Sequence, residues 1–333
     1  MTSPVIAVAD GAFSARRHAI EREFGGRAAI RWADLSSAAA ARQSTAGADA
    51  VVVTLQRLSA EIIAAFGPSV RVIGRSGVGL DTIDLAAAAS RGITVVNQPA
   101  YGAQEVASHA LALLLAVQRR LLAADRYVRS GWAGPAALDG IQPLDEVTVG
   151  VLGCGRIGNA FVERVRPLVR QVLIYDAAPV PVPAGAERAA DIDDLLARSA
   201  ALSLHLPLSD STRGLIGARE LGLLPSGAVV VNVSRGGLID ESALADALYS
   251  GHVTGAGLDV FAEEPLPSTS PLLSTPNTVL TPHCASVSDR ASRRLSHWTI
   301  GDVIQYLDKG SVEHGVIVVA APDGLALPGA RQD

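Results

Sequence analysis

Gly153-Cys154-Gly155-Arg156-Ile157-Gly158 is a G-x-G-x-x-G sequence that stands between a predicted strand and a predicted helix. The apolar run from Thr148 to Leu152 predicts a buried strand before it, and residues 156 to about 169 predict a helix after it. Glycines at this spacing permit a tight turn and let backbone N–H groups approach a pyrophosphate at the N-terminus of the helix. The stretch therefore predicts a dinucleotide-binding unit rather than a glycine-rich turn without a ligand.

An acid follows the next predicted strand, Gln171 to Tyr175, and bears on the choice of cofactor. The Asp176 carboxylate can accept hydrogen bonds from both hydroxyls of an adenosine ribose and would repel a 2′-phosphate. Ala177, Ala178 and Pro179 come next and bring no cation to bind such a phosphate. The alternative is an acid that only ends a strand in solvent. We expect NAD rather than NADP.

Composition limits the protein class. A chain of 333 residues with 49% hydrophobic residues favours two domains with substantial cores. The most apolar stretch, Ala110 to Val117, is shorter than a bilayer span, and the N-terminus shows no signal-peptide pattern. Cys154 and Cys284 suggest no disulfide framework, and the net charge of −5 gives no basic footprint for nucleic acid. We expect a cytoplasmic protein without membrane, nucleic-acid or metal binding.

Short β-rich runs alternate with helical stretches along the chain. The runs before the glycine loop are Val5–Ala9, Ala28–Trp32, Ala50–Leu55, Arg71–Gly74 and Ile93–Val96. Those after residue 176 are Ala201–Leu206, Ala228–Val233, Gly257–Val260 and Thr278–Leu280. Continuous apolar strands separated by helices indicate parallel sheets covered on both faces. The fold class is α/β, with two doubly wound parallel-sheet domains.

Two longer helical patterns and a tail complete the organisation. The pattern from about Gln104 to Ser130 is more apolar than one solvent-facing helix needs, so we expect it at a domain seam or a homodimer interface. The last pattern, Ser288 to about Asp308, follows the second series of strands and is expected to return to the first domain. The tail from Pro322 to Asp333 is expected to be disordered or a crossing arm.

The predicted carboxyl ends of the second series carry groups suited to hydride transfer. Ligands bind outside these ends, which carry His205, Arg235, Asp259 and His283, followed in one loop by Glu263 and Glu264. Reduction of a 2-oxo acid needs a cation, a proton donor and a carboxylate that orients the donor. Arg235, His283 and Glu264 can fill these roles. Taken singly, Arg235 could also be a surface cation, and Glu263 and Glu264 could be a solvated turn. His205, before Pro207, could be a structural histidine at a strand end.

Several motifs in fixed order resemble the D-isomer-specific 2-hydroxyacid dehydrogenases over nearly the whole chain. They are residues 77–84 (GVGLDTID), 150–158 (GVLGCGRIG), 205–214 (HLPLSDSTRG), 232–241 (NVSRGGLIDE), 257–265 (GLDVFAEEP) and 281–283 (TPH). Residues 97–109 (NQPAYGAQEVASH) are most similar to the branch of the C-terminal-binding-protein relatives. The resemblance implies a Rossmann NAD-binding domain, 102–286, inserted into a flavodoxin-like substrate domain, 1–101 and 287–333.

The resemblance also assigns residue roles. Its catalytic set falls on Arg235, Glu264 and His283, with Glu264 chosen over Glu263 because it directly precedes Pro265. The backbone of Ser76, Gly77, Val78 and Gly79 would bind the substrate carboxylate. Arg75 matches a substrate-binding arginine of the branch, or is only a charged strand-end residue. Besides the glycine loop and Asp176, the implied cofactor positions are His205, Leu206, Pro207, Thr212, Val233, Ser234, Asp259 and Ser286.

Two departures from the family pattern affect what can be carried over. Ser286 stands where the branch often has an aromatic residue, so substrate preferences tied to that ring do not transfer. Ser108 stands where most members have an acid.

Two functions follow from these observations. The first is an NAD-dependent D-2-hydroxyacid dehydrogenase, and the alternative is an NAD(H)-sensing, corepressor-like binding protein. Oxidation of an inorganic or one-carbon anion is a minor third option. The intact catalytic set and the lack of long polar tails favour the dehydrogenase.

Overall fold

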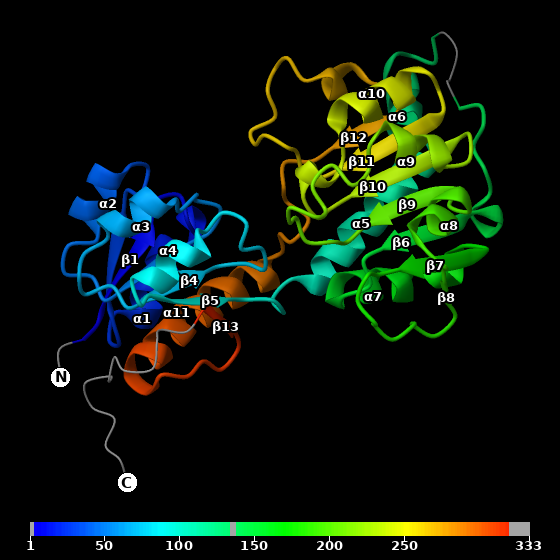
Figure 1. Cartoon of the computed structure of the whole chain (residues 1–333). Coiled ribbons are helices and arrows are strands. Elements are labelled where there is room, and N and C mark those ends of the chain that lie inside the picture. Colours follow the sequence, from blue (N-terminus) through cyan, green and yellow to red (C-terminus); the bar gives the residue numbers. More distant parts are fainter. Residues whose placement is uncertain (1–2, 134–137, 320–333) are drawn as a thin grey trace. The chain divides into compact units, whose positions relative to one another are not determined.

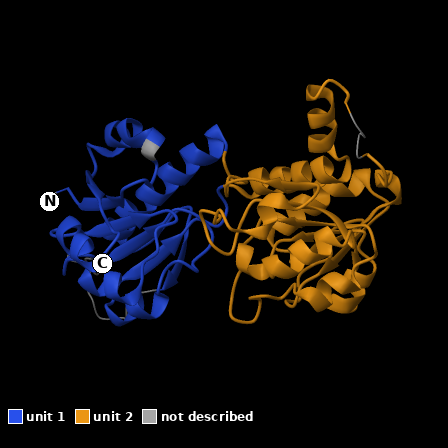
Figure 2. Cartoon of the chain, turned by 90° about the horizontal axis from the view of Figure 1, so that it is seen from above, with its two compact units in different colours: residues 1–101, 288–333 blue, residues 102–287 orange. Residues whose placement is uncertain are grey.

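The computed structural model describes residues 3–133 and 138–319, which form two compact units. Unit 1 comprises Met1–Tyr101 and Ser288–Asp333, and unit 2 comprises Gly102–Val287 (Figure 2). The predicted tail, Pro322 to Asp333, lies outside the described residues.

Unit 1 is built on a six-stranded sheet with the order β13-β5-β4-β3-β1-β2 (Figure 1). Its strands are β1 (Val5–Ala9), β2 (Ala29–Ala33), β3 (Ala50–Val53), β4 (Val72–Arg75), β5 (Thr94–Asn97) and β13 (Val316–Val319). The first five are parallel in the order 2-1-3-4-5 of flavodoxin-like folds. The sequence predicts a parallel sheet. The structure differs at one edge, where β13 pairs antiparallel with β5.

The helices of unit 1 are α1 (Arg17–Phe24), α2 (Ala38–Ser44), α3 (Ala60–Ala65), α4 (Leu85–Ser90) and α11 (Asp289–Lys309). Side chains of Ser37, Ser59, Asp84 and Ser288 accept first-turn N–H groups at four of their N-termini. Helix α11 packs closely on β4, because a Cβ added at Gly74 would lie 2.6 Å from Val303. The late segment thus completes the core of unit 1.

Unit 2 is built on a seven-stranded parallel sheet with the order β12-β11-β10-β9-β6-β7-β8. The strands are β6 (Thr148–Leu152), β7 (Gln171–Tyr175), β8 (Glu187–Arg188), β9 (Ala201–Leu204), β10 (Ala228–Asn232), β11 (Val253–Leu258) and β12 (Thr278–Leu280). In chain order, the first six read 3-2-1-4-5-6, which is the Rossmann arrangement. The crevice beside the first strand, β6, is where such folds bind dinucleotides.

The helices of unit 2 are α5 (Ala103–Gln118), α6 (Leu121–Arg129), α7 (Arg156–Val165), α8 (Ile192–Ala197), α9 (Ala218–Leu223) and α10 (Glu241–Tyr249). Short 3₁₀ turns in the two units are Ser14–Arg16, Leu144–Glu146, Arg166–Leu168, Gly236–Leu238 and Pro271–Ser274. Both faces of the sheet are covered by buried apolar side chains, as the continuous apolar strands require.

The prediction of one helix from Gln104 to Ser130 is wrong. The backbone of Arg120 adopts a left-handed conformation with φ of 50°, and the chain bends by 58° between α5 and α6. The apolar face of α5 packs into the core of unit 2, which accounts for its excess of apolar residues. In contrast, α6 has no buried residue.

No single helix in the described ranges is long and apolar enough to cross a membrane. The bent pair α5 and α6 passes that test of length and composition jointly, with α5 serving as a core helix of unit 2.

One buried carboxylate attaches the late segment of unit 1 to its sheet. Asp302 on α11 is 1% exposed. Its oxygens accept hydrogen bonds from the N–H groups of Glu313 (2.9 Å), His314 (3.2 Å) and Gly315 (2.7 Å) and from the Gln98 amide (2.8 Å). These bonds fix the approach to β13 against the end of β5.

Replacing Asp302 with Ala is expected to destabilise unit 1 by about 3 kcal/mol or more, because four donors lose a shared charged acceptor. Hydrogen-exchange protection of β5 and β13 measures this loss within unit 1. Asp308→Ala on the exposed side of the same helix is the matched control. Wild-type protection in Asp302→Ala would contradict the assignment.

Candidate active site

The glycine loop joins β6 to α7, and two of its three glycines, Gly153 and Gly158, are required by close backbone contacts. Gly153 has φ of 93°, and a Cβ on it would lie 2.7 Å from the backbone of His205. A Cβ on Gly158 would lie 2.1 Å from the Gly153 carbonyl oxygen. Gly155, the N-cap of α7, has open space around its added Cβ. The loop therefore leaves its backbone accessible at the helix N-terminus, as a pyrophosphate requires.

The acid after β7 is oriented beside this loop. Asp176 accepts hydrogen bonds from the Cys154 N–H (2.8 Å) and the Ala178 N–H (2.9 Å). Burial and the nearby Asp176 charge raise the pKa of the Cys154 thiol to about 11, so that thiol is neutral. Arg156 and Ile157 form the first turn of α7. The Asp176 carboxylate, an acceptor for ribose hydroxyls, and the open glycine fit the adenosine and the pyrophosphate of a dinucleotide.

His205, at the carboxyl end of β9, is suited to contact rather than proton transfer. Burial lowers its pKa to about 3, so the ring is neutral near pH 7. The ring packs against Phe161 with centroids 5.0 Å apart, and Nε2 lies 2.9 Å from the Ser203 hydroxyl. Its Nδ1 has no hydrogen-bond partner among the described residues. An orphaned polar atom here fits a position that a bound cofactor would cover.

The other predicted cofactor positions brace the loops around that edge. Thr212 donates to the Pro207 carbonyl (2.8 Å), and Ser234 donates to the Leu204 carbonyl (2.8 Å). Val233 is buried, whereas Leu206 and Ser286 are half-buried. Each lies in a segment that follows the carboxyl end of a strand of unit 2, as the sequence predicts.

The predicted catalytic residues come together within unit 2. His283 Nδ1 lies 2.7 Å from Glu264 Oε2, with the two side chains 26% and 31% exposed. Burial would raise the pKa of the Glu264 carboxyl, but the hydrogen bonds from His283 and Phe261 and the charges of His283 and Arg235 lower it overall. A carboxylate only accepts, so Nδ1 of His283 carries a proton and Nε2 remains for substrate.

The backbone of His283 is held in a strained conformation. Its φ of 52° lies in the left-handed region, which costs a non-glycine residue about 1–3 kcal/mol. The Asp259 carbonyl accepts from the His283 N–H (2.8 Å), and the Asp259 carboxylate accepts from the N–H groups of Cys284 (2.9 Å) and Ala285 (2.8 Å). Asp259 therefore holds the loop around the proposed proton donor.

The sequence predicts a cofactor role for Asp259 but does not point to two residues near it, Thr281 and His109. Thr281 donates to Asp259 (2.6 Å), and His109 Nε2 lies 3.0 Å from the Thr281 hydroxyl. The ligand atoms of His109, Asp259 and Cys284 lie within 4.8 Å of one another. His109 stands 150 residues before Asp259 along the chain, so no spacing pattern connects them.

The predicted carboxylate-binding turn follows β4 in unit 1. The N–H of Ser76 donates to the Val53 carbonyl (2.7 Å), which corrects its inclusion among the available N–H groups. The N–H groups of Gly77, Val78 and Gly79 have no partner among the described residues. The Ser76 hydroxyl is also buried without a hydrogen-bond partner there. Three amides and this hydroxyl form the available donor set.

The buried side chain of Arg75 stabilises this turn through hydrogen bonds to its carbonyls. It is 4% exposed, and its guanidinium donates to the carbonyls of Gly79 (2.9 Å) and Ser76. Gly77, with φ of 140°, leaves room for that guanidinium, since an added Cβ would lie 2.4 Å from it. The carbonyls of the turn are thereby drawn away from its N–H groups.

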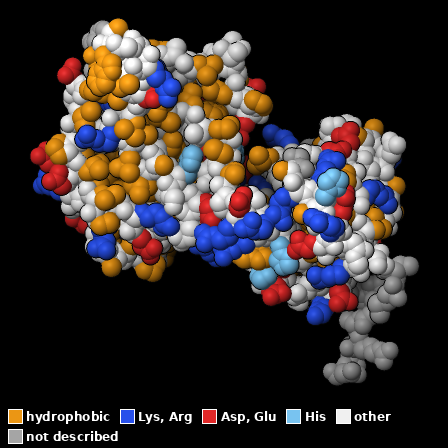
Figure 3. All heavy atoms as spheres, turned by 180° about the vertical axis from the view of Figure 1, so that it is seen from behind, with side chains coloured by type: hydrophobic (Ala, Val, Ile, Leu, Met, Phe, Trp, Pro, Cys, Tyr) orange, Lys and Arg blue, Asp and Glu red, His pale blue; other side chains and the backbone are white. Residues whose placement is uncertain are grey.

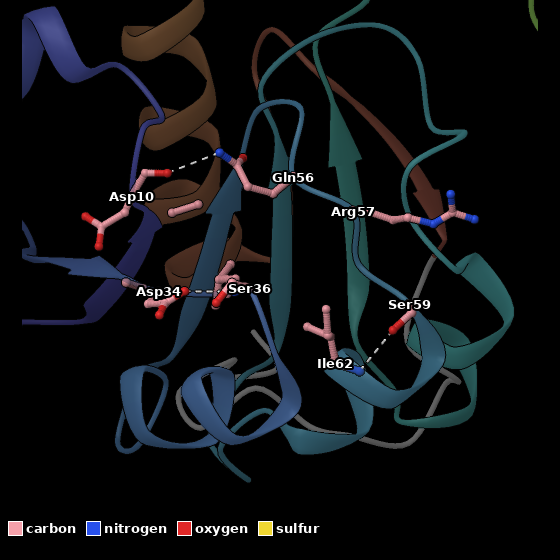
Figure 4. Close-up of a pocket in the computed structure, with 10 residues that line it drawn as sticks. Asp10, Asp34, Ser36, Gln56, Arg57, Ser59 and Ile62 are labelled. Carbon is pink, nitrogen blue, oxygen red and sulfur yellow. Dashed lines mark hydrogen bonds between the residues drawn. The ribbon is translucent and has the colours of Figure 1, made fainter. Parts of the chain in front are cut away.

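Unit 1 also contains a cavity of about 420 Å³ at the carboxyl ends of β1 and β2 (Figure 4). Its polar groups pair locally: Gln56 with the Asp10 carbonyl, and Asp34 with the Ser36 N–H. Arg57 points away from both acids (Figure 4). None of the predicted site residues lines this cavity.

Comparisons with known proteins identify the family of the chain. The profile of the family described as "D-isomer specific 2-hydroxyacid dehydrogenase, NAD binding domain" matches residues 111–285, within unit 2. D-3-phosphoglycerate dehydrogenase of Mycobacterium tuberculosis is 39% identical over 299 residues, 88% of this chain and 55% of that protein. Glyoxylate reductase of Korarchaeum cryptofilum is 38% identical over 78% of this chain and 79% of the relative. The chain spans about half the length of the phosphoglycerate dehydrogenases that it matches.

Solved structures show the same fold. An NADPH-dependent glyoxylate/hydroxypyruvate reductase from Sinorhizobium meliloti, in complex with NADP and malonate, has a TM-score of 0.85 and 30% identity over 95% of this chain and 97% of that one. A glyoxylate reductase from Paecilomyes thermophila has a TM-score of 0.84 and 28% identity over 95% and 99%. The matches do not single out the C-terminal-binding-protein branch. Sequence, fold and site agree that the chain belongs to the D-isomer-specific 2-hydroxyacid dehydrogenase family, with an NAD-binding domain in unit 2.

Proposed function

We propose that this protein is an NAD-dependent D-2-hydroxyacid dehydrogenase that interconverts a small 2-oxo acid and the D-2-hydroxy acid. The His283–Glu264 pair beside Arg235, in the same unit as the dinucleotide loop, is the observation that carries the proposal. The relatives named above are dehydrogenases and reductases, so the corepressor-like alternative has no support among them.

The chain's own residues divide the work of reduction. When bound, the nicotinamide cofactor supplies the hydride for the 2-oxo carbon. His283 donates the proton from Nε2 to the carbonyl oxygen, while Glu264 stabilises the imidazolium and holds the ring. Arg235 binds and polarises the 2-oxo acid. The turn at Gly77–Gly79 offers N–H donors to the substrate carboxylate, and Arg75 keeps that turn in shape.

NADH oxidation with a panel of 2-oxo acids tests the function directly. The panel comprises glyoxylate, hydroxypyruvate, pyruvate, phenylpyruvate and bulkier acids, so that it covers a wide range of side-chain sizes. We expect saturable turnover of at least one and a D-configured product by chiral chromatography. Tight NADH binding without turnover of any acid would instead favour the binding-protein alternative.

Replacing His283 with Ala is expected to slow the chemical step by about a hundredfold or more, because the general acid is lost. NADH affinity should change little, since the glycine loop and Asp176 belong to a different part of unit 2. Single-turnover rates and NADH titration measure the two effects. Near wild-type turnover would require another proton donor, and His205, with a pKa of about 3, is a poor one.

Replacing Glu264 with Gln is expected to shift the pH profile of reduction to lower pH. The His283 hydrogen bond helps to lower the pKa of Glu264, so the pair is strongest when the carboxylate is ionised and the imidazole protonated. A neutral amide removes the negative charge that stabilises the protonated imidazole. Glu263→Gln, in the exposed neighbouring position, is the matched control and should keep the wild-type profile.

NAD(H) is proposed to be preferred over NADP(H), because the Asp176 carboxylate is oriented beside the glycine loop. Asp176→Ala should narrow the preference measured as the ratio of kcat/KM for NADH and NADPH. Arg188 on β8 is a cation near the glycine loop, because its charge acts on the thiol of Cys154. Its distance from Asp176 along the chain hides this from the sequence pattern. A wild-type protein more efficient with NADPH would overturn the proposal and point to Arg188.

We also propose that the protein is a cytoplasmic homodimer. Large apolar side chains stand exposed on and just after α6: Leu121 (52%), Leu122 (40%), Val128 (49%) and Trp132 (67%). Figure 3 shows hydrophobic side chains gathered on one face of unit 2. Exposed apolar patches of this kind mark association surfaces. Leu121→Glu combined with Leu122→Glu should yield monomers by sedimentation, and a monomeric wild type at micromolar concentration would refute the dimer.

A further inference from the structure

A histidine outside the proposed catalytic set contacts the loop that carries His283. His109 lies on α5, half-buried, with its side chain 24% exposed. Its Nε2 is 3.0 Å from the Thr281 hydroxyl and 3.5 Å from Asp259 Oδ1. Helix α5 thus reaches the carboxyl ends of β11 and β12, where the proposed chemistry takes place.

The direction of each hydrogen bond in this group is determined by the chemistry of its members. Burial would raise the pKa of Asp259, but hydrogen bonds from His109, Thr281 and two backbone N–H groups lower it, so the carboxylate is ionised and only accepts. The Thr281 hydroxyl has one hydrogen and donates it to Asp259 over 2.6 Å. Thr281 must therefore accept from His109, whose Nε2 carries a proton.

The chain of contacts ends at the backbone of His283. Oδ1 of Asp259, the atom that accepts from Thr281, also accepts from the Cys284 N–H (2.9 Å). The other oxygen accepts from the Ala285 N–H (2.8 Å), and the Asp259 carbonyl accepts from the His283 N–H. A change in the position of this carboxylate therefore moves the backbone that directly follows His283 and the Thr281 side chain that precedes it.

We propose that His109 is a positioning residue for His283 and acts through Thr281 and the Asp259 carboxylate. The proposal rests on the proposed role of His283 as proton donor. His109 orients Thr281, Thr281 and the loop amides orient Asp259, and Asp259 keeps His283 in its left-handed conformation against Glu264. Without His109, the loop relaxes and the His283–Glu264 pair loosens.

A metal ion held by His109, Asp259 and Cys284 is the competing account of this cluster, since their ligand atoms lie within 4.8 Å. Two observations favour the hydrogen-bonded network. Oδ1 of Asp259 already accepts two hydrogen bonds. Burial and the Asp259 charge raise the pKa of the Cys284 thiol, which opposes the thiolate that zinc requires.

Two readouts separate positioning from a merely structural role. The first is kcat and KM for the best 2-oxo acid, with the NADH dissociation constant. The second is the NMR titration midpoint of the His283 ring, assigned with a His283→Gln variant, which needs no turnover. The titratable and charged groups that share this region are Glu264, Arg235, Glu241, Asp259, Cys284 and His109.

Four variants make the test specific. His109→Leu and Thr281→Val are expected to lower kcat about tenfold, with NADH affinity largely kept, because small misplacements of a reacting group are costly. Both should move the His283 midpoint to lower pH as its pair with Glu264 loosens. His109→Gln keeps an N–H donor at similar reach and should restore both values. His252→Leu, which removes a histidine that contacts the Leu221 carbonyl elsewhere in unit 2, is the matched control.

The remaining outcomes decide against the proposal. Variants that lose thermal stability but keep the kcat and the His283 midpoint would show a merely structural role. Effects of His109→Leu and Thr281→Val that add fully in the double variant would exclude a shared path. Stoichiometric zinc in the wild type that is lost in His109→Leu would replace the network with a metal site. If no 2-oxo acid is reduced while the midpoint shifts as expected, the proposed function fails and the positioning of His283 stands.

Discussion

An ionised carboxylate without exposed surface must be surrounded by hydrogen-bond donors, and Asp259 meets this requirement with the loop that carries His283. Three donors come from residues 281–285, so the carboxylate organises the loop and is stabilised by it. The left-handed backbone of His283 persists because these bonds over-determine it. The pairing of His283 with Glu264 depends in turn on that backbone. Much of the proposed chemistry therefore rests on one buried charge.

The two units use a common device to present N–H groups. In unit 2, the glycines of the first turn bring a helix N-terminus close to the strand and leave one glycine open. In unit 1, a buried guanidinium, Arg75, draws the carbonyls of a turn toward itself. In both places backbone N–H groups stay available to a ligand, because the nearby backbone carbonyls accept hydrogen bonds from other groups of the protein. The residue types differ because the turn after β6 leads directly into helix α7, whereas the turn after β4 does not lead directly into a helix.

The sequence is most informative where a local rule acts. Turn geometry and fixed spacing predict the glycine loop and Asp176, whereas the choice of Glu264 over Glu263 comes from the family resemblance. The sequence predicts a strand at Gly257–Val260, but β11 begins four residues earlier, at Val253. The prediction misses this start because Gly255 and Gly257 weaken the strand pattern. These glycines are needed because α5 packs so close that their added Cβ atoms would lie 2.4 Å from Val117 and 2.8 Å from Leu113. The helix break at Arg120, the antiparallel β13 and the contact of His109 with Thr281 all depend on tertiary packing that no short window contains.

The division of unit 1 between the two ends of the chain has a consequence for biosynthesis. Helix α11 covers β4, and β13 completes the sheet beside β5, yet both are translated after all of unit 2. The first five strands therefore leave the ribosome with an apolar face uncovered and an edge unpaired. Unit 2 is continuous and has its whole sheet available first. Folding during synthesis is thus expected to proceed from the middle of the chain outward, with the N-terminal strands in need of protection until α11 arrives.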